Sequence, residues 1–347
     1  MRVTIDDIAR LANVSKTTVS RVINEQPEGV GPATRARVLK IIDEYDYRPN
    51  LLARGVVTSK TRTLGFIIPD ITNPFFPELF KSVEDYAAEQ GYTVILCNTD
   101  SSFEKEEKAI STLIAKRVDG VLLSSMIGNQ QSIQERFEKY NIPCVLLDRC
   151  TDQPGHGAGV YIDNEYALFI ATKHLIVNGN REIAFISGPD SLPTSKERLE
   201  GYRGALSAYH IPFHTNLMIS GSFSMESGYR AITQLIQQKT AFTAVLAGND
   251  MIAIGALKAL KDLGLSVPEQ VEVIGFDNIR LSGMTEPALT TISQPIHRLG
   301  REAVKILISL TGGQQPMLKS IKLEPRLILR DSTKNRYPQK AYGDIAV

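Results

Sequence analysis

The stretch Leu64-Gly-Phe-Ile-Ile-Pro-Asp70 decides the fold, because it returns in a similar form as Ile183-Ala-Phe-Ile-Ser-Gly-Pro-Asp190. Each stretch opens with a near-continuous apolar run, which is typical of a strand buried on both faces of a parallel sheet. Similar runs follow each stretch and are separated by amphipathic segments with helical spacing. These runs are residues 92–97, 120–123 and 143–148 in the first half, and residues 217–220, 244–246 and 272–276 in the second. The alternation predicts an α/β fold with two similar halves in tandem, each a parallel sheet covered by helices on both faces.

Two such halves predict two lobes with a cleft between them, and open parallel sheets bind ligands outside the carboxyl ends of their strands. Polar and aromatic residues follow several of the predicted strands at these ends. They include Asn73, Phe75 and Phe76, the pair Asp148-Arg149, and the pair Asp277-Asn278. Aromatic faces stack on the apolar side of a sugar ring, while carboxylates, amides and a guanidinium bind its hydroxyls. Each residue alone is more typical of a core or a helix cap, but the combination predicts a site for a small sugar-like ligand.

Residues 4–46 have the spacing of three short helices. Thr4 and Ser15 are placed to cap the first and second helices, and Pro32 suits the first position of the third. The inner face of the third helix is expected to consist of Val38, Ile41, Ile42 and Tyr45.

The second of these helices has an exposed face that suits DNA. Its outward side chains form a polar, cationic strip without an acidic residue. The strip consists of Lys16, Thr17, Ser20, Arg21 and Asn24. Arg21 can donate two parallel hydrogen bonds to a guanine edge, Thr17 can contact a thymine methyl group, and Ser15 can meet a phosphate at the helix start. Most helical hairpins bind no DNA, so it is the strip that favours a DNA-reading head.

Composition and charge are those of a soluble globular protein with a slightly basic head. Of the 347 residues, 43% are hydrophobic and 22% are charged. Residues 1–60 contain ten Lys and Arg against seven Asp and Glu, a net charge of +3, whereas the remainder has 29 against 31, a net charge of −2. This distribution permits DNA binding by the head. No stretch has the length and apolar character of a signal sequence or a membrane span, which indicates a cytoplasmic protein.

Signatures of enzymes and metal sites are absent from the sequence. It contains no GxxxxGK[ST] loop, no HExxH pair and no GxSxG elbow after a strand. The three cysteines include no CxxC pair, and the five histidines have no carboxylate or cysteine at metal-ligand spacing. We therefore expect no enzymatic activity, no metal and no cofactor. Buried, inert thiols are expected at Cys97 and Cys144, and surface or linker positions for all five histidines.

Several motifs carry a resemblance when they are taken together. They are Val3-Thr-Ile-Asp-Asp-Ile-Ala-Arg-Leu-Ala-Asn-Val-Ser-Lys-Thr-Thr-Val-Ser-Arg-Val-Ile-Asn24, Tyr47-Arg-Pro-Asn50, Ala53-Arg54, Pro69-Asp-Ile-Thr-Asn-Pro-Phe-Phe76, Val118-Asp-Gly120, Gly248-Asn-Asp250 and Val273-Ile-Gly-Phe-Asp-Asn278. Over about residues 2–330, this combination resembles the LacI/GalR family of bacterial repressors. The resemblance implies a homodimer, or a dimer of dimers, that binds a near-palindromic operator and regulates transcription, usually by repression.

The resemblance also implies the domain order. A helix-turn-helix head is expected over residues 1–48, a hinge helix and linker over 49–63, a two-lobed, periplasmic-binding-protein-like domain for effector binding and dimerisation over 64–330, and a tail over 331–347. Lobe 1 is expected over about residues 64–161 plus 293–320, and lobe 2 over about residues 162–292 plus 321–330.

In the head, Lys16, Thr17 and Arg21 match the base-reading positions of the family. The family's hinge becomes helical on the operator and enters the minor groove as an apolar wedge, which Val56 would provide here. The family usually has a small polar residue and a leucine after Ala53-Arg54, whereas this chain has Gly55 and Val56. The predicted DNA-binding residues are Ser15, Lys16, Thr17, Ser20, Arg21, Asn24, Tyr47, Asn50, Arg54 and Val56.

In the body, the sugar contacts of the family and of related periplasmic pentose-binding proteins match one set of positions. The predicted effector-binding residues are Asn73, Phe75, Phe76, Asp148, Arg149, Thr194, Arg198, Phe223, Asn249, Asp277 and Gln294. The set resembles the ribose-type pattern most, while a hexose, a sugar acid or a nucleoside stays open. Two other classes of function are alternatives: a sugar-processing enzyme, and a regulator switched by a phosphorylated partner protein that docks on lobe 1.

The glycine in the hinge gives a first testable prediction. A hinge of seven or eight residues is too short to be a stable helix in water, so it orders only on the operator. A glycine inside a helix costs about 1 kcal/mol relative to alanine, or about 2 kcal/mol for the two hinges of a dimer. Gly55→Ala should therefore tighten operator binding by about tenfold or more and raise the effector concentration needed for release. A titration of the operator with the Gly55→Ala protein checks this prediction. Weaker binding would show instead that Gly55 lies where a methyl group cannot fit.

Overall fold

The computed structural model describes residues 3–23, 29–47, 60–124, 130–148, 157–314 and 320–334. These residues form two compact units, which divide between Thr61 and Arg62. We call the first unit the head and the second the body, and each is described by itself. The predicted hinge, including Asn50, Gly55 and Val56, lies outside the described residues.

The described part of the head contains the three predicted helices. They are α1 (Ile5–Leu11), α2 (Lys16–Ile23) and α3 (Pro32–Glu44). Thr4 caps α1, since its hydroxyl accepts a hydrogen bond from the Asp7 N–H at 3.3 Å while the Asp7 carboxylate accepts from the Thr4 N–H at 3.0 Å. Ser15 caps α2 by accepting from the Thr18 N–H at 3.1 Å. The head core consists of Ile8, Ala9, Ala12, Val19, Val22 and Val38.

One residue of the predicted inner face of α3 is placed differently. Tyr45 follows the helix end and is 44% exposed, while Tyr47 packs against the head core instead. Asp46 between them has a positive φ of 40°, which turns the backbone so that the second tyrosine faces inward. The helical spacing did not predict this turn, so the expectation for Tyr45 was wrong.

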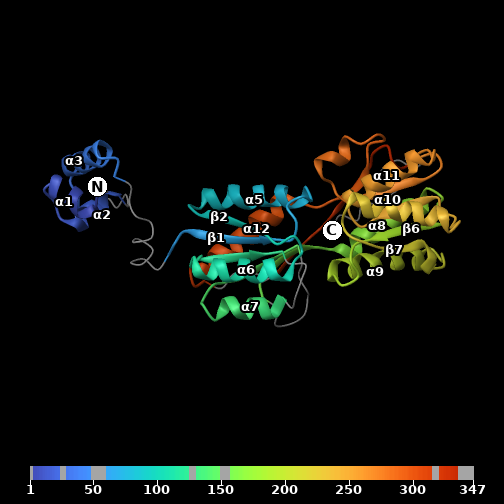
Figure 1. Ribbon diagram of the computed structural model, residues 1–347, viewed down its shortest axis with the longest axis horizontal. Coiled ribbons are helices and arrows are strands. Elements are labelled where there is room, and N and C mark those ends of the chain that lie inside the picture. The colour runs from blue at the N-terminus through green and yellow to red at the C-terminus, as the bar shows by residue number, and fades with distance from the viewer. Residues whose placement is uncertain are drawn as a thin grey trace. The chain divides into compact units, whose positions relative to one another are not determined.

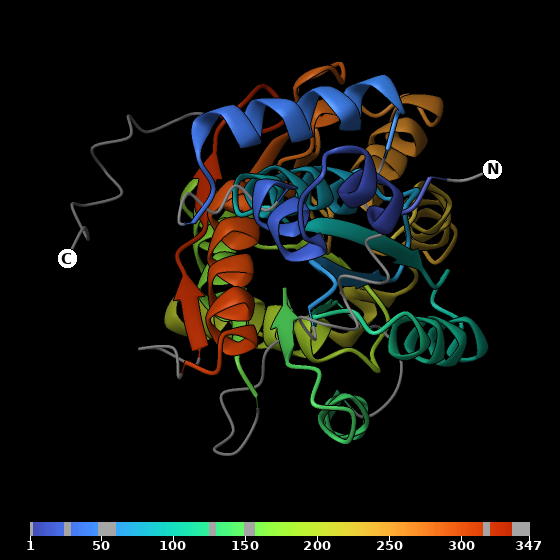
Figure 2. The same cartoon turned by 90° about the vertical axis from the view of Figure 1, so that its left-hand side faces the viewer.

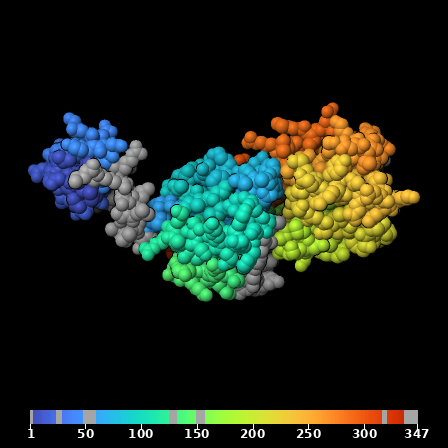
Figure 3. All heavy atoms as spheres, viewed as in Figure 1, coloured from blue at the N-terminus to red at the C-terminus, as the bar shows by residue number. Residues whose placement is uncertain are grey.

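The body contains two sheets with the same strand order, as the tandem repeat predicts. In the first, the order is β11 (Ser320–Leu323), β5 (Gly159–Ile162), β4 (Cys144–Leu147), β3 (Gly120–Leu123), β1 (Thr63–Ile68) and β2 (Thr93–Asn98). In the second, it is β12 (Arg326–Ile328), β10 (Thr290–Ser293), β9 (Glu272–Asp277), β8 (Ala244–Ala247), β6 (Ile183–Ser187) and β7 (Met218–Ser220). All neighbouring strands in the described residues are parallel except β10 and β12. We call the parts built on these sheets lobe 1 and lobe 2 (cyan to green and yellow to orange in Figure 3).

Helices cover both faces of each sheet (Figure 1). In lobe 1, α5 (Phe75–Glu89) and α12 (Ile296–Thr311) lie on one face, and α6 (Phe103–Ala115) and α7 (Gln130–Glu138) on the other. In lobe 2, the two faces carry α8 (Asn164–Val177) with α9 (Pro193–Ala208), and α10 (Met225–Gln237) with α11 (Asp250–Asp262). Two short 3-10 turns, η1 (Thr215–Leu217) and η2 (Arg280–Gly283), lie in the connections of lobe 2. Because of this double cover, β6 and β9 are buried along their whole length.

The chain passes from one lobe to the other after β5, after β10 and after β11. The predicted last crossing at residue 320 falls at the start of β11, which pairs with β5, so the described chain leaves lobe 1 only after Leu323 (red strands in Figure 2). The predicted tail also begins too early. Ser332 is fully buried in lobe 2, where its N–H bonds to the Ala288 carbonyl at 2.9 Å and its carbonyl accepts from the Val273 N–H at 2.9 Å.

One histidine was expected at the surface and is buried instead. His174 in α8 is 1% exposed, and its ring nitrogen Nε2 lies 3.2 Å from the Thr333 hydroxyl and 3.2 Å from the Asn178 amide. Burial lowers the pKa of His174 to about 4, so the ring is neutral at physiological pH. The partner Thr333 lies 159 residues away in sequence, which explains why local pattern could not reveal this position. His210, His214 and His297 are exposed as expected, and His156 lies outside the described residues.

The two described cysteines lie in lobe 1. Cys97 and Cys144 are partly buried free thiols. Burial raises the pKa of Cys97 and raises that of Cys144 to about 12. Both thiols are therefore protonated and unreactive at neutral pH, as expected.

Two glycines of α9 give a matched prediction about stability. A methyl group at Gly201 would lie 2.0 Å from the Glu165 carbonyl oxygen in α8, whereas at Gly204 the nearest atom, in the Phe169 ring, is 3.7 Å away. Gly204→Ala should raise the free energy of unfolding by about 0.5–1 kcal/mol, because alanine is the better helix former. Gly201→Ala should lower it by about 1–3 kcal/mol, because α8 and α9 must separate. Urea unfolding followed by circular dichroism checks the pair, and a stabilising effect at both positions would contradict the close contact.

Candidate functional site

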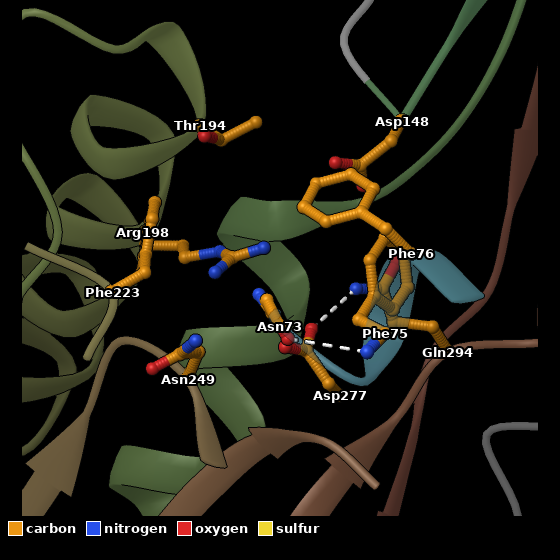
Figure 4. A pocket seen from close by; sticks show the side chains of 10 residues that line it. All are labelled: Asn73, Phe75, Phe76, Asp148, Thr194, Arg198, Phe223, Asn249, Asp277 and Gln294. Carbon is orange, nitrogen blue, oxygen red and sulfur yellow. Dashed lines mark hydrogen bonds between the residues drawn. The ribbon is translucent and has the colours of Figure 1, made fainter. Parts of the chain in front are cut away.

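A pocket lies at the carboxyl ends of the strands and is lined from both lobes. Its lining residues are Asn73, Phe75, Phe76, Asp148, Thr194, Arg198, Phe223, Asn249, Asp277 and Gln294. The structure thus brings together every predicted effector-binding residue that it describes, while Arg149 lies outside the described residues. Figure 4 shows Thr194, Arg198 and Asn249 on one side of the pocket, and Phe75, Phe76 and Asp148 on the other.

The wall from lobe 1 is built at the start of α5 and the end of β4. The Asn73 carboxamide accepts a hydrogen bond from the Phe75 N–H at 3.1 Å, which fixes the first turn of the helix. The rings of Phe75 and Phe76 then meet edge to face, with their centroids 5.2 Å apart. Asp148 follows β4 with a positive φ of 68°, where the chain turns. This wall therefore presents an aromatic surface beside a carboxyl group.

The wall from lobe 2 contains a buried cation. Arg198 in α9 is 5% exposed, and its side chain points toward the middle of the pocket (Figure 4). It donates from Nε to the Asn164 carboxamide oxygen at 2.9 Å and from Nη1 to the Gly248 carbonyl at 2.6 Å. Its guanidinium carbon lies 3.6 Å from the centre of the Phe276 ring. These contacts fix the plane of the guanidinium and leave further N–H groups for a ligand.

Two carboxyl groups compensate this cation. Burial lowers the pKa of Arg198, whereas Asp277 and Asp148 raise it, and the guanidinium stays charged. Burial also raises the pKa of Asp277 well above its ordinary value, which Arg198 opposes. Asp277 has a positive φ of 111° and accepts a hydrogen bond from the Gln294 amide at 2.7 Å. Its carboxyl group is thus held in place at the end of β9 by a strained backbone and a side-chain amide.

Two polar atoms of the pocket are available to a ligand. The Asn249 carboxamide oxygen caps α11 by accepting from the Ile252 N–H at 2.9 Å, and its amide Nδ2 is buried. The carboxamide oxygen of Gln294 is buried as well. Neither atom has a hydrogen-bond partner among the described residues. A buried polar group of this kind costs free energy until a partner reaches it, so a ligand with hydroxyl groups suits both atoms.

Sequence reasoning did not select three residues that support this site. Asn164 bridges Arg198 to the Glu197 carboxylate, to which its amide donates at 2.9 Å. Phe276 stacks against the guanidinium. Asp250 lies behind Asp277, accepts from the Thr291 hydroxyl at 2.5 Å and from the Ile279 N–H at 2.9 Å, and has its pKa raised to about 7 by burial. The available signal for Asp250 and Phe276 was their place beside Asn249 and Asp277 in the motifs Gly248-Asn-Asp250 and Val273-Ile-Gly-Phe-Asp-Asn278, whereas Asn164 had none.

No group of three or more potential metal ligands occurs in the described part of the chain. None of the described helices is long and apolar enough to cross a membrane.

In the head, the predicted DNA-reading strip lies along α2. Lys16, Thr17 and Arg21 are exposed, and Ser20 is partly buried. An acidic residue of another helix lies beside the strip: the Lys16 ammonium group forms an ion pair with the Asp6 carboxylate of α1 at 3.0 Å. Both side chains are more than half exposed, so the pair is weak and Lys16 can exchange Asp6 for a phosphate or a base. Asn24, Asn50, Arg54 and Val56 lie outside the described residues.

Two family models match the chain. The model of the bacterial regulatory proteins of the lacI family matches residues 4–50. The model of the periplasmic binding proteins and sugar binding domain of the LacI family matches residues 61–322. The chain belongs to the LacI family. The two matches fall on the head and the body, respectively.

Individual relatives support the assignment to the LacI family. Catabolite control protein A of Priestia megaterium is 37% identical and aligns with 96% of this chain and all of its own length. A lac repressor dimer bound to operator and the anti-inducer ONPF is similar in structure with a TM-score of 0.86 at 28% identity, covering 96% of this chain and 99% of the repressor chain. A LacI family regulator from Enterococcus faecium with bound ribose has a TM-score of 0.70 at 33% identity, covering 78% of this chain and 98% of its own. The protein is a DNA-binding transcription regulator controlled by a small-molecule effector.

The buried guanidinium gives the prediction for this site. Arg198→Ala should abolish the effector response while leaving operator affinity without effector nearly intact, since each charged hydrogen bond contributes about 1.5–3 kcal/mol. Arg198→Lys tests the need for the planar guanidinium, and Arg203→Ala, at an exposed position of the same helix, is the control. Calorimetry with the sugar that most stabilises the unmodified protein checks the prediction. Unchanged sugar affinity in Arg198→Ala would remove this residue from the site.

Proposed function

We propose that the protein binds a near-palindromic operator as a homodimer in the cytoplasm, represses transcription, and changes its operator affinity when a neutral sugar occupies the pocket. One observation carries this proposal: aromatic rings and hydrogen-bonding side chains from both lobes converge on a single pocket. Phe75, Phe76 and Phe223 offer faces for the apolar side of a sugar ring. Arg198, Asn249 and Gln294 offer donors and acceptors for its hydroxyls.

The charges of the pocket favour a neutral sugar over a sugar acid or a sugar phosphate. Among the described lining residues, the one guanidinium is that of Arg198, and it faces the carboxyl groups of Asp148 and Asp277. The described lining thus has no excess positive charge to compensate a carboxylate or phosphate, whose burial without a partner is costly. The ribose bound to the Enterococcus faecium regulator is a neutral sugar of this class.

Binding from both lobes gives the sugar a way to act on DNA. A ligand that contacts both lobes favours the arrangement in which both walls reach it, and a ligand shifts an equilibrium only by its different affinity for the two states. In a homodimer, that shift would alter the spacing of the two heads and their hinges, on which binding to two half-sites depends. We assign no enzymatic activity to the pocket.

The proposal is tested with purified full-length protein. An operator is first selected from random duplex DNA, and its affinity is then measured by fluorescence anisotropy with D-ribose, D-galactose, D-gluconate and D-ribose 5-phosphate. A change in operator affinity with a neutral sugar, and none with the acid or the phosphate, is the expected result. If no sugar acts and a phosphorylated protein partner from the same cell is required instead, the sugar proposal fails. Recovery of chemically altered sugar would show an enzyme.

The exposed face of α2 gives the prediction for DNA. Arg21→Ala should cost about 1–3 kcal/mol per half-site and relax base preference at one symmetric position, because a bidentate contact to a guanine edge is lost. Competition of operator variants against the selected sequence measures this preference. Uniform weakening on every sequence, with a smaller salt dependence, would show that Arg21 contacts only phosphate.

A further inference from the structure

The Phe223 ring of the pocket rests on a glycine. Gly188 is the first residue after β6, and the loop after β7 brings Phe223 over it. A methyl carbon built on Gly188 would lie 2.2, 2.4 and 2.7 Å from the Cζ, Cε1 and Cε2 atoms of this ring. Carbon atoms without a bond pack at about 3.5–4.0 Å, so the ring occupies space that any larger residue at position 188 would need.

The backbone at Gly188 cannot retreat from the ring, because hydrogen bonds and a second glycine hold it. Its carbonyl accepts from the Ser187 hydroxyl at 2.9 Å and from the Ser220 hydroxyl at 3.2 Å. On the adjacent strand end, Gly248 packs so closely that a methyl carbon there would lie 3.0 Å from the Gly188 nitrogen. The carbonyl of Gly248 in turn accepts a hydrogen bond from Arg198 Nη1 at 2.6 Å. The support under Phe223 is therefore tied to the support of the guanidinium.

We propose that Gly188 determines which sugars fit. Because it has no side chain, the Phe223 ring can lie against its backbone and stay outside the space that a ligand fills. The inference rests on the proposed function, since it takes the pocket as a sugar site. Gly188 is not among the residues that line the pocket, so it is a positioning residue. Its φ is not in the left-handed region, so alanine suits the backbone and the ring must move instead. Because Phe223 lines the pocket, the displaced ring shortens it on that side.

A double-variant cycle tests this role. Gly188→Ala, Phe223→Leu and the combined variant are titrated by calorimetry with D-ribose and with the larger D-galactose. If the unmodified protein binds one of these sugars, Gly188→Ala should reduce the affinity for that sugar by about tenfold or more. If it binds both, the loss should be larger for D-galactose. In the Phe223→Leu background the same change should cost less than about threefold, because the ring that causes the collision is gone. Gly204→Ala, which meets no atom closer than 3.7 Å, is the control and should leave both affinities unchanged.

A second measurement decides the inference even if neither sugar binds. The chain contains no tryptophan, so Phe223→Trp introduces a single indole at the pocket wall. Acrylamide should quench this indole more strongly when position 188 is alanine, because the ring is pushed into the open pocket, and Gly204→Ala should leave the quenching unchanged. Stronger quenching in a protein that binds no sugar would overturn the proposed function and the role in sugar choice, while it would support the position that Gly188 gives to the ring.

Two results would overturn the role of Gly188. One is equal quenching with glycine and alanine at position 188. The other is an equal loss of sugar affinity with phenylalanine and leucine at position 223, which would show that the added methyl group acts through something other than the ring. If Gly188→Ala alone does not fold, the combined variant should still fold, because leucine vacates the space. Failure of the combined variant would place the collision in the backbone and contradict the proposal.

Discussion

Each sheet of the body is buried on both faces, and this constraint decides where the polar chemistry can be. A strand such as β9 has no exposed side, so its backbone groups bond within the protein, to neighbouring strands and to Ser332, and most of its side chains are apolar. Polar side chains become tolerable where a strand ends and the chain turns. Asp148, Asn249 and Asp277 occupy such positions after β4, after β8 and at the end of β9. The pocket forms because these ends, in both lobes, border the same space.

The buried guanidinium is the most demanding group that this arrangement supports. An ionised group away from water is costly unless its N–H groups and its charge are compensated. Arg198 is compensated by a side-chain amide, a main-chain carbonyl, an aromatic face and two carboxyl groups, none of them from its own helix. None of these contacts requires a ligand, so the cation is oriented before a ligand arrives. Such pre-organisation lowers the entropic cost of binding.

The sequence predicted the parts of the fold that have continuous apolar runs, and it did not predict the strands that lack them. β10 consists of Thr290-Thr-Ile-Ser293, whose polar side chains indicate a loop when read alone. They are buried because distant residues satisfy them: the Thr291 hydroxyl donates to Asp250, and the Thr290 hydroxyl accepts from the Arg330 N–H. β5, β11 and β12, with three or four residues each, were not predicted either. Partners far along the chain, rather than local propensity, make these segments strands.

For the site, resemblance selected the residues that face the pocket, and the described ones do line it. The resemblance did not select the residues that lie behind them. Asn164 reads in sequence as an ordinary first residue of a helix, and Phe276 as one more apolar residue of a strand. Their contribution depends on the position of Arg198, 34 residues from the first and on a different element from both. In the head, Asp6 lay outside the exposed strip of α2, and only the packing of two helices brings it to Lys16.

The final residues of the described chain complete structures begun far earlier. β11 extends the first sheet beside β5, β12 closes the second beside β10, and the Lys334 N–H then bonds to the Glu272 carboxylate at 2.9 Å. During synthesis, neither lobe can be finished before the ribosome has passed these residues, although many multidomain proteins fold one domain after another from the N-terminus. Only the head, whose core comes from neighbouring helices, is complete early. A premature stop or a proteolytic cut shortly before residue 320 would therefore disable both lobes at once and leave a DNA-reading head without its sensor.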